Sequence, residues 1–278
     1  MMDDVRSELR EIPNAEINRN TDTRDMLALA ARQRRDYNLD DYLVIDVDAH
    51  HFETRSWAEV IEYIPDEVIR DIAGNFKAGG KVTPGIIQAS SWPTHQNVGG
   101  RIPHDPGTDE DTEGEGVHRD VVLARRALES MGIDYQITFP TPMLSLGMHP
   151  ELDVEIAVSR GYNRWLCDRV IGEDDRIKTS IFLPFNDPPA CEQMVEEFGE
   201  TKGVIGFTVT SIRYKPVHHN SYMRLYAMLE ERGMPLSFHA GPFWGASEGM
   251  LSQVNRFVSA HALSFSWCNM VHLANWVM

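Results

Sequence analysis

The sequence is poor in cysteine. Cys167, Cys191 and Cys268 are the three cysteines among 278 residues, and no two of them form a Cys-x-x-Cys pair. An odd number of widely spaced cysteines predicts neither a disulfide framework nor a cysteine-rich zinc site. Such a composition is typical of a reducing compartment, so we expect a cytoplasmic protein. The polar N-terminus, which lacks the apolar core of a signal peptide, agrees with that expectation.

Basic residues are also scarce relative to acidic ones. Lysine and arginine total 26 against 42 aspartates and glutamates, which gives a net charge of -16. A strongly acidic surface repels phosphate backbones and anionic lipid headgroups, so we expect neither nucleic acid nor a membrane as a partner. No glycine-rich phosphate loop follows any predicted strand, which makes a nucleotide-binding sheet the poorer choice of fold.

The C-terminal segment lacks charged residues. Residues 258–278 contain no Lys, Arg, Asp or Glu over a length that could span a bilayer. They do contain serine, histidine and asparagine, and their large apolar residues recur at helical spacing. This pattern favours a buried amphipathic helix over a membrane span.

The rest of the chain alternates between apolar strand patterns and amphipathic helix patterns with short joins. Strands are predicted at 43–47, 135–139, 177–183, 203–210 and 235–239, and helices at 57–72 with a break at Pro65, 118–131, 152–171, 189–198 and 222–232. The strands are apolar on both faces, which indicates a parallel sheet built from βαβ units. An open doubly wound sheet and a (β/α)8 barrel both fit this rhythm. Polar residues after several strands favour the barrel, where such residues collect around one mouth.

Two of these strand ends carry groups that bind metals. Asp48 and His50 lie two residues apart on the first strand, so their side chains point to the same side, with Glu53 just beyond. A carboxylate and an imidazole preset in this way form half of a divalent-metal site. An equally weighted interpretation is a polar turn in which Asp48 caps the next helix. His239 ends the fifth strand, and a barrel would bring it to the same mouth.

Two further segments stand apart from the alternating pattern. Residues 1–41 form a polar N-terminal arm with one predicted helix at 25–35, which is either an oligomer contact or a disordered leader. Residues 79–116 form a long irregular insertion rich in glycine, proline and acidic residues. An insertion of this length in a compact domain is typical of an active-site lid, and we expect it over the mouth that holds His239.

Several short motifs resemble one enzyme family in their order along the chain. Asp46-Val47-Asp48-Ala49-His50 resembles the opening of the amidohydrolase superfamily, and is closest to its amidohydrolase-related branch, which includes aminocarboxymuconate-semialdehyde decarboxylase-like and resorcylate decarboxylase-like enzymes. The further motifs are Met131-Gly132-Ile133-Asp134 with Phe139-Pro140-Thr141, Gly161-Tyr162-Asn163, Phe238-His239-Ala240-Gly241, and Asn269 to Ala274. The resemblance covers residues 43–278.

The resemblance implies a (β/α)8 barrel with one divalent metal, usually zinc and sometimes manganese. On this chain the implied ligands are Asp48, His50 and His239. The family also takes a histidine from the sixth strand and a catalytic aspartate from the eighth, and neither has a match here. His272 lies in a predicted helix and is not assigned as that ligand.

The implied function is a metal-dependent hydrolase or a non-oxidative decarboxylase that acts on a small organic or aromatic acid. A divalent metal supports either reaction, by activating water or by polarising a substrate oxygen. Arg101 is the candidate clamp for the substrate carboxylate. The alternative is a non-catalytic barrel fragment that serves only in binding or assembly. A homo-oligomer is also an open expectation.

The length of the pattern suggests a barrel truncated after about five strands. The fifth strand ends at His239, and the remaining 39 residues show no further strand pattern. We therefore expect a fragment of a longer enzyme, with its catalytic aspartate beyond the chain end, an exposed apolar wall and little activity of its own.

Overall fold

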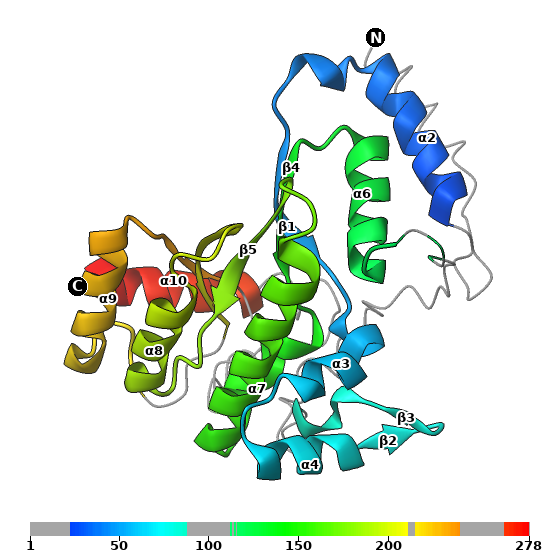
Figure 1. Ribbon diagram of the computed structural model, residues 1–278. Helices are drawn as coiled ribbons and strands as arrows, with labels where there is room; N and C mark the ends of the chain where they lie inside the picture. Colours follow the sequence, from blue (N-terminus) through cyan, green and yellow to red (C-terminus); the bar gives the residue numbers. More distant parts are fainter. Residues whose placement is uncertain are drawn as a thin grey trace.

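The computed structural model describes residues 23–87, 112, 114, 116–210, 215–239 and 264–277. A sheet of five parallel strands lies at its centre: β1 (Ile45–His50), β4 (Tyr135–Phe139), β5 (Ile177–Phe182), β6 (Val204–Val209) and β7 (Leu236–Phe238) (Figure 1). Their order in the sheet is β1-β4-β5-β6-β7, which is the order along the chain. A doubly wound sheet reverses its order at a switch point, so an unbroken parallel order indicates barrel winding. The predicted barrel architecture is confirmed over these five strands.

Helices connect the strands at the places that the sequence predicts. They are α6 (Arg119–Met131), α7 (Leu152–Leu166), α8 (Pro188–Phe198) and α9 (Met223–Arg232). Local chemistry sets their ends. Asp187 caps the first turn of α8 by accepting a hydrogen bond from Ala190 N. Gly132 and Gly233 end α6 and α9 at positive φ, which glycine adopts without strain.

The connection between β1 and β4 is more ordered than its composition suggests. It contains η2 (Glu53–Ser56), α3 (Trp57–Glu62), α4 (Glu67–Asn75), a hairpin of β2 (Lys77–Ala78) and β3 (Lys81–Val82), and η3 (Pro84–Ile87). The expectation that residues 79–116 are irregular throughout is therefore wrong for 79–87. Gly79 and Gly80 both have positive φ and form a two-residue hairpin turn. Ile86 and Ile87 are buried in the core.

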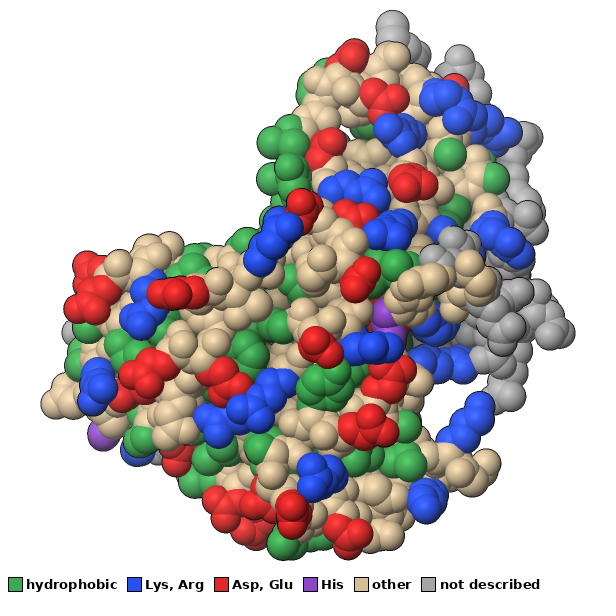
Figure 2. Space-filling view, in the orientation of Figure 1, with side chains coloured by type: hydrophobic (Ala, Val, Ile, Leu, Met, Phe, Trp, Pro, Cys, Tyr) green, Lys and Arg blue, Asp and Glu red, His purple; other side chains and the backbone are tan. Residues whose placement is uncertain are grey.

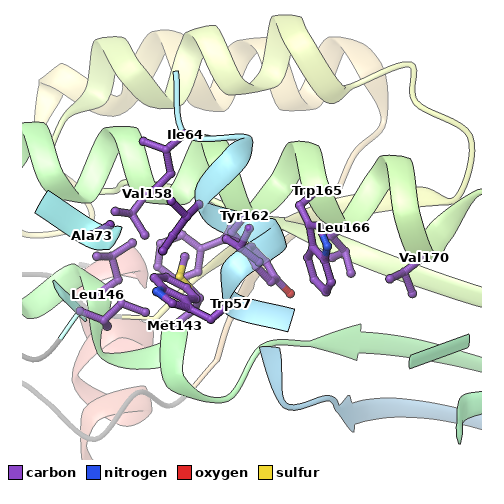
Figure 3. Close-up of a cluster of buried hydrophobic side chains, with 14 of the residues drawn as sticks. Trp57, Ile64, Ala73, Met143, Leu146, Val158, Tyr162, Trp165, Leu166 and Val170 are labelled. Atoms are coloured by element: carbon purple, nitrogen blue, oxygen red, sulfur yellow. The ribbon is translucent and has the colours of Figure 1, made fainter. Parts of the chain in front are cut away.

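The larger of two hydrophobic clusters lies where α3 and α4 pack against α7. Its centre is formed by Trp57, Tyr162, Trp165 and their neighbours, shown in Figure 3. Gly161 permits the close approach of α3 to α7, because a Cβ at this position would lie 2.7 Å from Ile64 Cγ1. Next to it, Asn163 joins α7 to the sheet with two hydrogen bonds. Its Nδ2 donates to Phe182 O at 2.8 Å, and its Oδ1 accepts from Phe182 N at 3.1 Å.

The second cluster fills the space between the later strands and their helices. Phe207 and Val209 of β6 contribute to it, together with apolar residues of α8 and α9. Helix α10 (Ser264–Val277) packs at its margin, where the Trp276 ring contacts those of Tyr226 and Phe238. Within the described residues, the structure contains no helix with the length and apolarity needed to cross a membrane.

The N-terminal arm includes one helix that lies against the barrel. Helix α2 (Thr23–Asp36) runs beside α6, at the upper right of Figure 1. Arg34 donates hydrogen bonds to Asp40 and to Glu129 O on α6, which fixes the end of α2. A role of the arm as an oligomer contact remains a prediction.

Strand β1 is more exposed than its sequence suggests. Ile45 is 47% exposed and Val47 is 63% exposed, although an apolar run of this kind predicts a strand buried on both faces. The reason is the position of β1 at the edge of the sheet, where its one neighbouring strand among the described residues is β4. Figure 2 shows hydrophobic side chains along this edge, while charged side chains of both signs cover much of the visible surface.

Candidate metal centre

The strand ends bring three predicted side chains together. Asp48 and His50 lie at the end of β1, and His239 directly follows β7, where its N–H donates to Val209 O at 2.9 Å. Strands β1 and β7 occupy opposite edges of the sheet, yet His50 Nε2 lies 3.0 Å from His239 Nε2. The sheet is therefore strongly curled, and residues 189 positions apart meet across its mouth.

The spacing of the three groups suits a single metal ion. Asp48 Oδ1 is 3.0 Å from His239 Nε2 and 3.5 Å from His50 Nε2. Ligands that bind a tetrahedral zinc ion at 2.0–2.1 Å are about 3.3 Å apart. The three contacts of 3.0, 3.0 and 3.5 Å scatter around this value. One carboxylate and two imidazoles also form a donor set that divalent metals prefer, so the residues fit the metal.

A backbone carbonyl fixes the tautomer of His50. The Nδ1 of His50 lies 2.8 Å from Pro140 O, and a carbonyl oxygen can only accept. Nδ1 must therefore carry the proton, which leaves a lone pair on Nε2, the atom that faces Asp48 and His239. Metal-binding histidines are usually oriented in this way by a hydrogen bond from their second nitrogen.

Glu53 holds the segment that supplies this carbonyl. Its buried carboxylate accepts hydrogen bonds from Thr141 N at 2.9 Å and from Met143 N at 2.6 Å. Both donors lie at the start of η4 (Pro142–Met148), directly after Pro140. Burial raises the pKa of the Glu53 carboxyl, against the lowering effects of His51 and of these two bonds. Glu53 therefore holds the backbone segment that follows Pro140 in place. It is not one of the three converging groups.

A second polar cluster lies behind the site and was not predicted from the sequence. His51 points away from His50; its Nδ1 is 2.9 Å from Asp120 Oδ2 and its Nε2 is 2.8 Å from Tyr162 Oη. Burial would lower the pKa of His51, but the hydrogen bond and charge of Asp120 outweigh it, and the pKa is raised. Asp120 is 69 residues from His51, so no local pattern reveals the pair. Tyr162, from the Gly161-Tyr162-Asn163 motif, therefore has a structural contact with His51.

The alternative for Asp48, as a helix cap, does not fit. The next helical element, η2, has Phe52 at its N-cap and no side-chain capping bond. His272 also lies apart from the centre. It is buried on α10 with its ring 5.2 Å from that of Phe238, and burial lowers its pKa to about 4. Arg101 falls outside the described residues, as does the predicted lid from residue 88 to 111, so both remain predictions.

An aromatic ring borders the three converging groups. The Phe139 ring at the end of β4 lies 5.2 Å from the His239 ring and 6.2 Å from the His50 ring, centroid to centroid. The centre therefore combines one carboxylate oxygen and two imidazole nitrogens, with a buried aromatic ring packed against the two imidazoles. The role of Asp48, His50 and His239 as metal ligands remains a prediction, which their convergence favours.

A known structure shares this fold at low sequence identity. A 2,6-dihydroxybenzoate decarboxylase from Rhizobium has a TM-score of 0.50 and 15% identity, with 84% of this chain and 60% of that chain covered. A dihydroxybenzoic acid decarboxylase from Polaromonas sp. JS666, solved with manganese and the inhibitor 2-nitroresorcinol, has a TM-score of 0.49 and 12% identity. That match covers 84% of this chain and 59% of the other. The chain thus spans about 60% of the length of these structures.

No curated protein matches the sequence. A family model does match, under the description "Amidohydrolase", over residues 118–273, which is more than half of the chain. The matched region contains four of the five strands and His239, and begins after the Asp48 and His50 pair. The parallel order of the strands agrees with this match, and the chain belongs to the amidohydrolase family.

Proposed function

We propose that this chain carries the metal-binding side of a barrel that decarboxylates a small aromatic acid without an oxidant. The observation that carries the proposal is the convergence of Asp48, His50 and His239 at distances that suit one divalent ion. The family match supports a metal-dependent enzyme, and makes a purely structural barrel the less favoured alternative. Zinc and manganese are both compatible with one carboxylate and two imidazoles.

In this proposal the described residues hold and orient the substrate. A bound divalent ion supplies a Lewis acid for the carboxylate of the substrate and a neighbouring oxygen. The Pro140 carbonyl keeps the Nε2 lone pair of His50 directed toward the centre. The buried Phe139 ring packs beside the His239 ring and limits how far that imidazole can turn. In the reaction the bond between the ring carbon and the carboxyl carbon breaks, carbon dioxide leaves, and the ring carbon takes a proton.

The choice of decarboxylation over hydrolysis is part of the proposal. The Rhizobium structure that shares the fold is a 2,6-dihydroxybenzoate decarboxylase, which supplies a first substrate to test. Aromatic acids with a hydroxyl next to the carboxylate offer two oxygens to one metal. A small aromatic acid with a hydroxyl next to the carboxylate is therefore the proposed substrate class.

Metal binding is the direct test. Zn²⁺ and Mn²⁺ are titrated calorimetrically into chelator-treated protein, and the metal content is measured by mass spectrometry. We expect one ion per chain, and a loss of at least tenfold in affinity for Asp48→Ala, His50→Ala and His239→Ala. His218→Ala is the matched control, because His218 is exposed and outside the centre. Equal binding by all four variants would remove the basis of the proposal.

The reaction is tested on the metal-loaded protein. Release of carbon dioxide from 2,6-dihydroxybenzoate and from benzoate is measured in parallel, with an aromatic ester as a hydrolysis substrate. We expect a low rate of carbon dioxide release from the hydroxylated acid, because the chain spans about 60% of the related enzyme structures. We expect none from benzoate, which lacks the second oxygen. Hydrolysis of the ester without decarboxylation would replace the proposed reaction.

A further inference from the structure

Two buried threonine hydroxyls on β6 have no partner. Thr208 is 0% exposed and Thr210 is 7% exposed, and across the described part of the chain neither Oγ1 makes a hydrogen bond. Buried hydroxyls are usually satisfied, because leaving one unpaired costs most of its lost hydration. Two such hydroxyls on one strand therefore indicate that a bound molecule provides their hydrogen-bond partners.

The two hydroxyls face the same side of the sheet as the candidate metal centre. Phe207 and Val209 point into the core under α8 and α9, so the alternation of a strand turns Thr208 and Thr210 to the opposite, inner face. On the neighbouring strand Phe238 packs against the same core, which turns His239 inward. Val209 is paired with Phe238, so Thr210 lies directly beside His239.

The layer below repeats this arrangement. Thr208 is paired with Ser237, but Ser237 has a partner, since its hydroxyl donates to Phe207 O at 3.2 Å. The two unpaired hydroxyls are thus stacked along one strand, about 6.7 Å apart for residues i and i+2. The hydroxyl of Thr210 is level with His239, and that of Thr208 is farther from the mouth of the barrel.

We propose that Thr208 and Thr210 are substrate-binding residues that donate hydrogen bonds to oxygen atoms of the bound acid. This inference rests on the proposed function and deepens it, because it names the residues that bind the part of the substrate beyond the metal. Thr210 binds an oxygen next to the metal-bound carboxylate, and Thr208 binds a second oxygen farther along the ring. The pair selects an acid with several oxygens over a plain benzoate.

The unpaired state of these hydroxyls makes the inference testable without turnover. Thr→Val keeps the shape and removes the hydroxyl. In ligand-free protein, Thr210→Val and Thr208→Val have no hydrogen bond to lose, so we expect an unchanged or higher melting temperature. Thr179 is the matched control: it is a fully buried strand threonine, but its hydroxyl donates to Thr138 O at 2.9 Å. Thr179→Val should therefore lower the melting temperature by several degrees.

The second measurement is the affinity for a probe acid. Protein loaded with Mn²⁺ is titrated with 2,6-dihydroxybenzoate and, separately, with benzoate. We expect Thr210→Val and Thr208→Val each to weaken binding of the dihydroxy acid about 10- to 100-fold, the loss of one hydrogen bond to a charged or strongly polar oxygen. Thr210→Ser keeps the hydroxyl and should bind the dihydroxy acid with an affinity close to that of the wild type. Thr179→Val should leave this affinity unchanged.

The outcomes separate this inference from the proposed function. A lower melting temperature for both Thr210→Val and Thr208→Val, comparable to that of Thr179→Val, would show structural partners and overturn the inference. Unchanged affinity for the dihydroxy acid in both variants would also overturn it, as would wild-type protein that holds Mn²⁺ but binds no probe acid. If wild-type protein holds no metal, the proposed function fails, and the inference that rests on it fails with it.

Discussion

The two hydrogen bonds of Asn163 give the sharpest test of how the barrel is held together. Asn163 is fully buried on α7, and its amide both donates to Phe182 O and accepts from Phe182 N at the end of β5. Asn163→Leu keeps the approximate volume but removes both bonds. The N–H and C=O of Phe182 then remain buried at a residue that is 1% exposed, with no water to replace the amide.

The magnitude follows from these two groups. An unsatisfied buried donor or acceptor costs about 1–3 kcal/mol, so two cost about 2–6 kcal/mol, partly offset by the apolar side chain. We expect the free energy of unfolding to fall by about 3 kcal/mol. At 2–4 °C for each kcal/mol, the melting temperature should fall by about 6–12 °C. With an m-value of about 2 kcal/mol/M, the urea midpoint should fall by about 1.5 M.

Urea unfolding followed by circular dichroism measures this change. Ser159→Ala is the control on the same helix, because Ser159 is also fully buried and its hydroxyl donates to Ile156 O within α7. This variant should stay within about 0.5 kcal/mol of the wild type, since alanine favours the helix and no distant group loses a partner. A urea midpoint of Asn163→Leu equal to that of Ser159→Ala would refute the reasoning.

Two further variants test packing and burial. Gly161→Ala places a Cβ 2.7 Å from Ile64 Cγ1 and 3.0 Å from the Ile64 backbone, so we expect a loss of about 1–3 kcal/mol in urea unfolding, whereas Gly74→Ala, with open space at its Cβ, should be neutral or stabilising. Similar midpoints for the two glycine variants would contradict the packing. Burial lowers the pKa of His272 to about 4, so the fold holds the neutral ring. A histidine with a lowered pKa loses stability as pH falls from about 6.5 toward 4, by about 3 kcal/mol. Melting temperatures across this range should fall more for the wild type than for His272→Phe; parallel curves would show that His272 does not contribute.

Local sequence patterns were sufficient for the elements of the barrel. The strand at 135–139 and the helix at 118–131 agree with the structure to within a residue, because glycine at positive φ and apolar periodicity act over short distances. The pairing of Asp48 with His50 also followed from strand alternation alone. The hairpin at Lys77 to Val82 was missed, because its strands are two residues each and carry little periodicity.

Contacts between distant segments could not be predicted in this way. No spacing rule connects His51 to Asp120 and Tyr162, or Glu53 to the backbone of Thr141 and Met143, because these pairs are separated by 69 to 111 residues and depend on how helices cross the sheet. The same limit applied to β1. Its apolar residues predicted burial, and its place at the edge of the sheet left them exposed.

The sequence by itself determined which residues could bind a metal, because Asp48, His50 and His239 follow strands whose pattern is local. The tertiary structure decided that the three meet, because only the curl of the sheet brings β1 and β7 across one mouth. It also decided the tautomer of His50, through a carbonyl 90 residues away, and left the hydroxyls of Thr208 and Thr210 without partners on the inner face. Hydrogen bonding is satisfied or left open by neighbours in space, which the order of residues along the chain does not specify.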